Sequence, residues 1–324
     1  MIWLLALPII AIGAFVVAYN YLEGERLLHD IVYEYKLACT DLLTLDRQCA
    51  SRESRADVVV SLTTIPSRID FIAETLKSLM VQTRAPREIR INLPATSIRE
   101  KRDYVIPQWL EELRSIKLVR CEDWGPATKL LPALSAYEAD QAILVVDDDR
   151  IYAPNTVEVL EAAAREEPNA ALGLGGWIAP ADLTDRPTTL ISNVFQMPPA
   201  PLRTARLRTR TPVDILQGFA GYVVRPRFFD LGAVTDYSRA PAAAFFVDDV
   251  WISAHCRAAK YVVPSRATNF LRKRRAYLYK KTSLGWINRG GGDNAARNNT
   301  LMLKYLASVW RVGGPAKVEK QAEL

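Results

Sequence analysis

The feature that most constrains the fold is a short apolar run, residues 142–146, that ends directly in Asp147, Asp148 and Asp149. The run has the length of a strand and is rich in Ile and Val, which is typical of a strand buried on both faces of a parallel sheet. In such sheets, ligands bind beyond the carboxyl ends of the strands. Neither a solvated turn nor a helix cap needs three adjacent carboxylates, so the triplet favours a site for a hard cation, Mg²⁺ or Mn²⁺. An acidic turn after a strand is the alternative.

Strand and helix patterns alternate from residue 57 onward. Strands are predicted at 58–64, 88–94, 116–121, 142–146 and 170–174, and helices at 70–82, 107–114, 127–137 and 155–165. Strands separated by helices need right-handed crossovers, so we expect an α/β fold with a mostly parallel sheet and helices on both faces. Later features are a proline-rich insert that ends near residue 212, a turn into a strand at 218–224, and a helix opened by acids at 248–257.

An uncharged apolar stretch at the amino terminus, residues 2–19, is close to the shortest length that spans a bilayer as a helix. A cleaved signal peptide is the alternative, but no Lys or Arg precedes the stretch and no small-residue cleavage site follows it. We therefore expect a transmembrane anchor that is retained. Arg26 and Lys36, on the following flank, favour a cytoplasmic globular part on a bacterial inner membrane, and a Golgi type II orientation is the alternative.

Apolar residues continue at helical spacing from 22 to 45, which predicts a stalk helix that acts as a spacer between the anchor and the globular part. The polar, charged segment 47–57 marks the expected domain boundary. We therefore expect four parts: an anchor at 1–20, a stalk at 21–56, a globular α/β domain at 57–265, and a basic carboxyl-terminal segment with a lid and a helix at 266–324.

The chain has 324 residues and a formal net charge of +6, with basic runs at 203–210 and 266–281. Such runs attract anions, among them nucleic acid, membrane headgroups and a nucleoside diphosphate. No nucleic-acid fold motif accompanies the charge, so we do not expect a nucleic-acid partner. A solvated basic face is the alternative for both runs.

Four motifs in order resemble those of a GT-A glycosyltransferase. They are Ser-Leu-Thr-Thr-Ile-Pro-Ser-Arg at 61–68, Trp-Gly-Pro-Ala-Thr-Lys-Leu at 124–130, the aspartate triplet, and the Gly218 turn followed by the Asp248-Asp249 helix. The nearest pattern is a family-2-like group, and the order of the acidic motifs also resembles exostosin-type transferases. The resemblance covers about residues 57 to 265 and implies a Rossmann-like GT-A sheet.

The resemblance also implies a reaction and a set of site residues. It implies transfer from a nucleotide-sugar donor, of the UDP-sugar type, to a saccharide or glycolipid acceptor, with a divalent cation held by Asp149 and Asp147. Asp249, or its neighbour Asp248, is implied as the base that takes the proton of the acceptor hydroxyl. The donor-binding residues implied are Thr63, Thr64, Pro66, Arg68, Lys129, Asp147, Asp148, Gly218 and Gly221.

Each implied role has a structural alternative. The two threonines can belong to a turn, Lys129 can be a solvated helix residue, and the acid pair can simply cap a helix. His255 lies in the same predicted helix and is expected to be a packed or surface residue, not a ligand. The chain lacks the late histidine that many GT-A enzymes place on the metal. A closing lid is expected from Trp286, Asp293, Asn298 and Asn299 near three glycines, and a disordered link to a helix at 294–310 is the alternative.

Two other classes of protein remain open. A nucleotidyltransferase on a similar sheet would also use a metal and carboxylates, but residues 63–68 lack the glycine-rich phosphate loop typical of that class. A membrane-tethered binding protein that has lost catalysis is the second alternative. Because acids are present in both motifs, we favour an enzyme.

Overall fold

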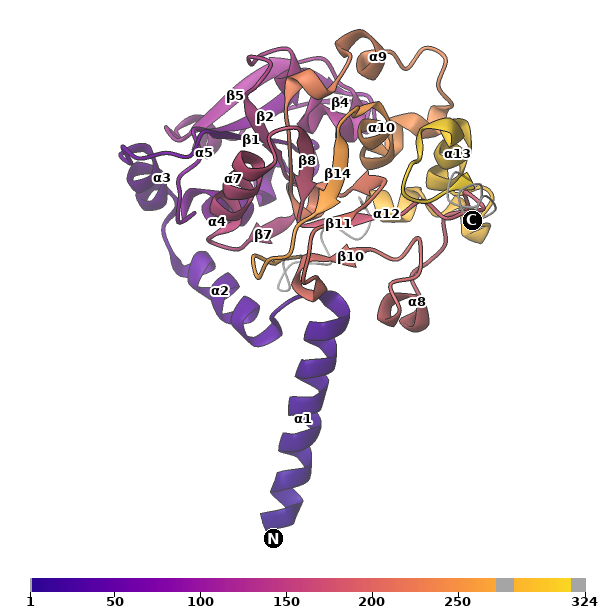
Figure 1. The fold of residues 1–324 in the computed structure, drawn as a ribbon. Helices are drawn as coiled ribbons and strands as arrows, with labels where there is room; N and C mark the ends of the chain where they lie inside the picture. Colours follow the sequence, from indigo (N-terminus) through magenta and orange to yellow (C-terminus); the bar gives the residue numbers. More distant parts are fainter. Residues whose placement is uncertain (1, 272–282, 316–324) are drawn as a thin grey trace.

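The computed structural model describes residues 2–271 and 283–315, which form an α/β domain from which one long helix projects (Figure 1). The central sheet has eight strands in the order β11-β14-β8-β13-β6-β1-β2-β5. These strands are β1 (Val58–Thr63), β2 (Glu88–Pro94), β5 (Ile116–Cys121), β6 (Ala142–Val145), β8 (Ala170–Gly173), β11 (Thr211–Pro212), β13 (Tyr222–Val224) and β14 (Ala259–Val262). Most of the second basic run, residues 272–281, lies outside the described residues.

The predicted parallel arrangement is confirmed for the first four strands of this sheet. β1 pairs in parallel with β2 on one side and with β6 on the other, and β2 pairs in parallel with β5. Two strands run antiparallel to their neighbours: β13, which lies between β6 and β8, and β11, which pairs with β14 at the end of the sheet. The acidic triplet at the end of β6 therefore lies beside the end of β1, at one edge of the sheet.

Side chains from the two faces of the sheet enter two separate hydrophobic cores. Along β6, Leu144 faces one core, whereas Ile143 and Val145 face the other. This alternation explains the continuous apolar run, because a strand covered on both faces has no side that favours polar residues. The helices that cover the first face are α3 (Leu42–Ala50), α4 (Ala73–Met80), α5 (Gln108–Glu111) and α7 (Thr156–Glu166). Those on the second face are α6 (Leu131–Leu134), α9 (Leu231–Thr235), α10 (Asp248–His255) and α13 (Asn298–Tyr305).

Several predicted helices are shorter than expected or broken. The helix predicted at 127–137 is a 3₁₀ helix, η2 (Gly125–Lys129), followed by the single turn α6. Each begins with a proline at its first or second position, and a proline there starts a helix but cannot continue one from the preceding turn. The helix predicted at 70–82 is likewise divided into η1 (Ile69–Phe71) and α4.

The proline-rich insert folds beside the main sheet. It contributes β9 (Gly175–Trp177) and β10 (Leu202–Arg203), which form a small antiparallel sheet with β12 (Ile215–Leu216), and a short exposed helix, α8 (Leu190–Val194). β7 (Arg150–Tyr152) directly follows the acidic triplet and pairs antiparallel with β15 (Asn269–Leu271).

The prediction of one spacer helix at 22–45 is wrong. The chain instead forms α1 (Ile2–Glu23) and α2 (Leu27–Cys39) before α3, and α2 packs on the domain, where the Lys77 ammonium donates to the Leu37 carbonyl at 2.9 Å. α3 contributes Leu45 and Cys49 to the first core, so the predicted boundary near residue 57 lies too late in the chain. The stalk pattern predicted helix but could not show that its faces pack against the domain.

Among the described residues, no single helix is both long and apolar enough to cross a membrane. The segments Leu7–Glu23 and Leu27–Cys39 meet that requirement only as a pair, and they are bent by 79° relative to each other. The predicted single anchor at 1–20 therefore stays a prediction.

Candidate active site

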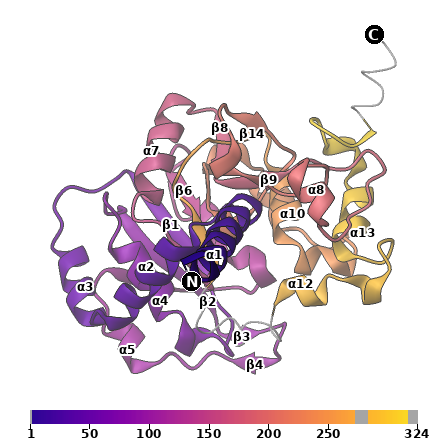
Figure 2. The same cartoon turned by 90° about the horizontal axis from the view of Figure 1, so that it is seen from below.

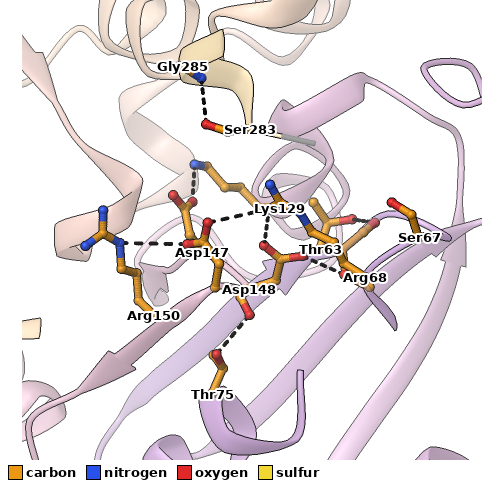
Figure 3. Close-up of polar contacts among 12 residues, drawn as sticks. Thr63, Ser67, Arg68, Thr75, Lys129, Asp147, Asp148, Arg150, Ser283 and Gly285 are labelled. Carbon is orange, nitrogen blue, oxygen red and sulfur yellow. Dashed lines mark hydrogen bonds and ion pairs between the residues drawn. The ribbon is translucent and has the colours of Figure 1, made fainter. Parts of the chain in front are cut away.

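The two acidic motifs meet in one cavity of about 400 Å³. It lies at the carboxyl ends of β1 and β6, with η2 and the first turn of α10 on its walls and residues 283–285 at its rim (Figure 3). Of the predicted site residues, those that line it are Thr63, Thr64, Arg68, Lys129, Asp147, Asp148, Asp149, Asp248 and Asp249. Segments more than a hundred residues apart thus form a single site.

Asp148 holds the acidic tip against the end of β1. Its carboxylate accepts a hydrogen bond from the Thr64 hydroxyl at 2.6 Å and pairs with the Arg68 guanidinium at 3.0 Å. Its carbonyl accepts a bond from the Thr75 hydroxyl at 2.8 Å. Because its side chain is buried and engaged in this way, Asp148 positions the site and is not a free ligand for a donor or a metal.

Arg68 lies between Asp148 and Asp149, 3.6 Å from the latter carboxylate. Burial alone would lower the pKa of this guanidinium, but the two carboxylates outweigh that effect and raise it above its usual value. Arg68 is therefore a fixed cation on the wall of the cavity.

Lys129 joins the two acidic motifs. Its ammonium lies 2.7 Å from an Asp147 oxygen, 2.7 Å from an Asp248 oxygen and 3.5 Å from an Asp249 oxygen. Burial would lower its pKa, yet these three carboxylates raise it well above the usual value. The solvated-lysine alternative is therefore wrong, since Lys129 is the buried cation that allows three acids to lie together.

Glycine at position 218 is needed for this arrangement. A Cβ there would lie 2.1 Å from the Lys129 ammonium and 2.9 Å from an Asp147 oxygen. Its backbone N–H donates to an Asp249 oxygen at 3.0 Å. The second predicted glycine, Gly221, has a φ of +87° in the turn into β13 and packs near Leu144, away from the cavity lining.

Asp249 and Asp248 open α10, where the helix dipole favours acids. Burial raises the pKa of Asp249 to about 7, and the nearby Asp248 and Asp147 carboxylates add to the rise although Lys129 opposes it. About 28% of the Asp249 side chain is exposed to the cavity, compared with 8% for Asp248. Of the two acids, Asp249 is the one placed to exchange a proton with a bound molecule.

Asp149 is the remaining acid of the triplet, with about 20% of its side chain exposed. The pKa of Asp149 is raised to about 6. Burial is the largest cause, the Asp148 and Asp147 carboxylates act in the same direction, and Arg150 and Arg68 oppose the rise. The described residues contain no group of three or more His, Cys, Asp or Glu side chains placed to hold a metal. Mg²⁺ needs only one or two carboxylates when substrate phosphates supply other ligands, and Asp149 meets that smaller requirement.

The predicted donor residues at 63–68 lie in two different hollows of the surface. The Thr63 hydroxyl donates to the Asn92 carbonyl at 2.8 Å, at the rim of the cavity. Pro66 lies outside the cavity and lines a separate shallow hollow with Asp70 and Arg102. Its assignment to the donor site stays a prediction, whereas Ile65 and Arg68 on either side of it line the cavity.

The cavity also contains residues that the sequence did not single out for a function. They are Ser97, Arg99, Tyr104, Asp123, Arg150, Trp177, Gln217, Phe219, Phe246, Ser283, Leu284, Gly285 and Asn288. The Arg150 guanidinium lies 4.6 Å from the centre of the Phe219 ring, a cation–π contact between the acidic tip and the Gly218 turn. The position of Arg150 directly after the triplet could have indicated from the sequence that it lines the site. The aromatic residues are distant in sequence, and only the fold brings them there.

The remaining predicted residues are His255 and the residues of the expected lid. His255 packs on the Trp251 ring and its Nδ1 lies 2.8 Å from the Trp251 carbonyl, so it is a packed residue as expected. Among the expected lid residues, Asn299 lines the cavity, whereas the Trp286 side chain is 60% exposed. The closing motion itself stays a prediction.

No protein-family model and no curated protein matches the chain. Among solved structures it is similar to S. aureus TarS 1–349 in complex with UDP, with 16% identity, a TM-score of 0.38, and coverage of 65% of this chain and 59% of that one. It is also similar to GalNAc-T7 with UDP, GalNAc and Mn²⁺, with 13% identity, a TM-score of 0.41, and coverage of 65% and 42%. At these TM-scores the structural similarity does not support an argument about function. The argument for a function rests on the residues of the cavity.

Proposed function

We propose that the protein is a glycosyltransferase that moves a sugar from a nucleoside diphosphate sugar, of the UDP-sugar type, to a saccharide or glycolipid acceptor. The observation that carries the proposal is the pairing of two acidic motifs in one cavity. The triplet lies at the sheet edge where α/β folds bind ligands, and Asp249 faces it across Lys129. This arrangement separates a site for a charged leaving group from a site for a proton acceptor.

The leaving group in such a transfer is a diphosphate that gains negative charge as the bond to the sugar breaks. Arg68 and Arg150 line the same part of the cavity and can stabilise that charge. Asp149, with Asp147 as its neighbour, would hold a divalent cation together with the phosphates, and when bound the cation acts as a Lewis acid on the phosphate oxygens.

The acceptor hydroxyl must lose a proton as it attacks the sugar. Asp249 is suited to take that proton because its pKa of about 7 leaves it partly ionised at neutral pH and still basic enough to accept. The Gly218 N–H holds one of its oxygens at 3.0 Å, and Lys129 lies 3.5 Å away, so its position is set from two sides.

The proposal includes attachment to a membrane by α1, with the catalytic domain on the cytoplasmic side as Arg26 and Lys36 favour. α1 projects away from the domain, and its exposed apolar side chains include Leu7, Ile9, Ile10, Ile12, Phe15 and Val17. A row of apolar side chains of this kind is favourable in lipid and unfavourable in water.

A panel of sugar nucleotides tests the proposal. Purified full-length protein in detergent is incubated with each donor, and the release of nucleoside diphosphate and of pyrophosphate is measured separately. We expect nucleoside diphosphate from at least one donor, and more of it when an acceptor is added. Pyrophosphate release would instead indicate a nucleotidyltransferase, and no release from any donor would contradict an enzymatic role for the cavity.

A further inference from the structure

α2 has an amphipathic pattern that is reversed relative to a helix on the surface of a soluble domain. Its exposed side includes Leu28, Ile31, Val32 and Tyr35, which are between 47% and 67% exposed. Positions spaced by three, four and seven residues lie on one face of a helix, so these side chains form one apolar stripe. The opposite side has buried Asp30 and Glu34 against the domain. A helix with its carboxylates inside and its apolar stripe outside is suited to an apolar environment on its outer side.

α8 and the residues directly after it present a second apolar patch. Leu190, Ile191, Phe195 and Met197 are between 52% and 73% exposed. In Figure 1 α8 lies on the same side of the domain as α2, the side from which α1 projects. Seen from below in Figure 2, α1 points toward the viewer with α2 on one side of it and α8 on the other.

The direction of α2 relative to α1 suits a membrane surface. The two helices are bent by 79°, so if α1 crosses a bilayer close to its normal, α2 lies close to the plane of the bilayer. The bend is at Gly24, which has a φ of +66°, and a Cβ there would lie 3.0 Å from the Arg203 Cβ. Only glycine combines that backbone conformation with such a close neighbour at little cost.

Hydrogen bonds to the last turn of α1 hold the bend to the domain. The Arg206 guanidinium donates to the Tyr21 carbonyl at 2.6 Å and to the Leu22 carbonyl at 2.7 Å. The Asn193 amide, which belongs to α8, donates to the same Leu22 carbonyl at 3.1 Å. The end of α1 is thus fixed directly to α8, and α1, α2 and α8 are arranged as one unit.

We infer that the apolar stripe of α2 and the apolar patch of α8 together form a membrane-contacting surface that lies at the boundary between lipid headgroups and acyl chains. The inference rests on the proposed role of α1 as an anchor. A bilayer is favoured over a protein partner because α1 passes between the two apolar faces. Any membrane that holds α1 must therefore meet both of them.

This surface would also fix the orientation of the catalytic cavity. The inner side of α2 packs through Leu37 against Ile151 and Phe270, which belong to the β7–β15 pair. β7 begins at Arg150, directly after the acidic triplet. A membrane contact by α2 would thus hold the cavity at a set orientation above the lipid surface.

Fluorescent probes on single cysteines in the full-length chain test the inference. Cys39 and Cys121, the exposed and half-buried thiols, are first replaced by serine, because Cys49 and Cys256 are buried. Probes are then placed by Val32→Cys, Phe195→Cys, Phe15→Cys and Val105→Cys, one per protein, and each protein is reconstituted into phosphatidylcholine vesicles. Val105 is 79% exposed and follows β4 (Arg102–Asp103), far from α1, so it serves as the matched water-facing control.

Each probe is quenched in turn by iodide in the water and by nitroxides attached to lipid chains. We expect the probes at positions 32 and 195 to be quenched by lipid nitroxides and to show several-fold less iodide quenching than the probe at position 105. The probe at position 15 reports on the anchor alone and should respond only to the lipid quencher. Because no step involves sugar transfer, the result does not depend on the enzymatic proposal.

Three outcomes would overturn the inference. If positions 32 and 195 respond to iodide as position 105 does while position 15 is lipid-quenched, the anchor stands and the membrane-contacting surface does not exist. If position 15 is also open to iodide, the anchor and the surface fail together. Shielding from iodide without lipid quenching, lost when the protein is diluted into more lipid, would show that a second copy of the chain covers these faces.

Discussion

Replacing Asp249 by Asn removes one carboxylate from the cavity while keeping its size and its ability to accept the hydrogen bond from the Gly218 N–H. Lys129 retains Asp147 and Asp248 as partners at 2.7 Å, so we expect the fold to persist. If Asp249 takes the acceptor proton, turnover should fall by about 10²-fold or more, because a positioned general base contributes about that much. Donor affinity should change little, since the lost interaction forms only in the transition state.

The pKa of Asp249 supplies a second measurement on the same residue. Burial raises this pKa to about 7, and a base acts only when it is ionised. We therefore expect the wild-type rate to rise by about tenfold per pH unit below pH 7 and to level off above it. In Asp249→Asn the rise between pH 6 and pH 7 should disappear, because amides do not titrate in this range, and only the fall at lower pH from protonation of Asp149, whose pKa is raised to about 6, should remain.

Initial rates of nucleoside diphosphate release, measured with saturating donor and acceptor from pH 5 to pH 9, give both quantities. Asp248→Asn is the comparison, because Asp248 opens the same helix and pairs with the same lysine but has a side chain only 8% exposed. Thermal unfolding of each variant separates a lost base from a lost fold.

The alternative role for Asp249 is that of a helix-terminal acid. Asn satisfies a helix end about as well as Asp, so this role predicts a near-normal rate and a stability loss of at most about 1 kcal/mol. A wild-type rate with an unchanged pH profile in Asp249→Asn would refute the assignment. An inactive, folded Asp248→Asn beside an active Asp249→Asn would assign the base to the neighbour.

Three further perturbations follow from the same structure. Asp149→Asn should abolish turnover in a folded protein, as should excess chelator with the wild type, whereas full activity in chelator would contradict a bound cation in the reaction. Lys129→Met should lower the free energy of unfolding by about 3–5 kcal/mol in urea titrations, because three carboxylates lose their shared buried cation, and unchanged stability would contradict the charge argument. A chain that begins at residue 52 lacks α3 and should unfold at lower urea than one that begins at residue 40, because Asp46 accepts hydrogen bonds from the Arg114 and Ser115 N–H groups at 3.0 and 2.8 Å. Equal midpoints for the two would show that α3 does not stabilise the domain.

Much of the sheet could be predicted from the sequence because its strands have local patterns of apolar residues. Glu88–Pro94 and Ile116–Cys121 agree with the predicted strands residue for residue, and in Glu88–Pro94 apolar residues occupy every second position, the period of a strand. The helices were harder, as the divided segment around η2 and α6 shows. Their apolar spacing is similar whether the chain makes one helix or two short turns, and the prolines that decide the matter act through local backbone geometry.

The acidic motifs were also predictable, because three adjacent aspartates after a buried strand are unusual in any structural role. The separate roles of these aspartates could not be predicted. Asp148 is engaged by Thr64, Arg68 and Thr75, which come from two other parts of the chain, and only the packed fold brings these groups to it. Adjacency in sequence likewise could not show that Pro66 lines a different hollow from its neighbours Ile65 and Arg68.

By itself, then, the sequence determined the parallel sheet, the acidic edge and the apolar amino-terminal helix, because each depends on a local pattern of side chains. Only the tertiary structure decided that Lys129 is a buried cation shared by both acidic motifs, because its three partners lie 18 or more positions away along the chain. It also decided which side of α2 faces outward. Leu28 and Val32 have the same spacing on a spacer helix as on a packed one, and it is the burial of Asp30 and Glu34 against the domain that leaves the apolar side exposed.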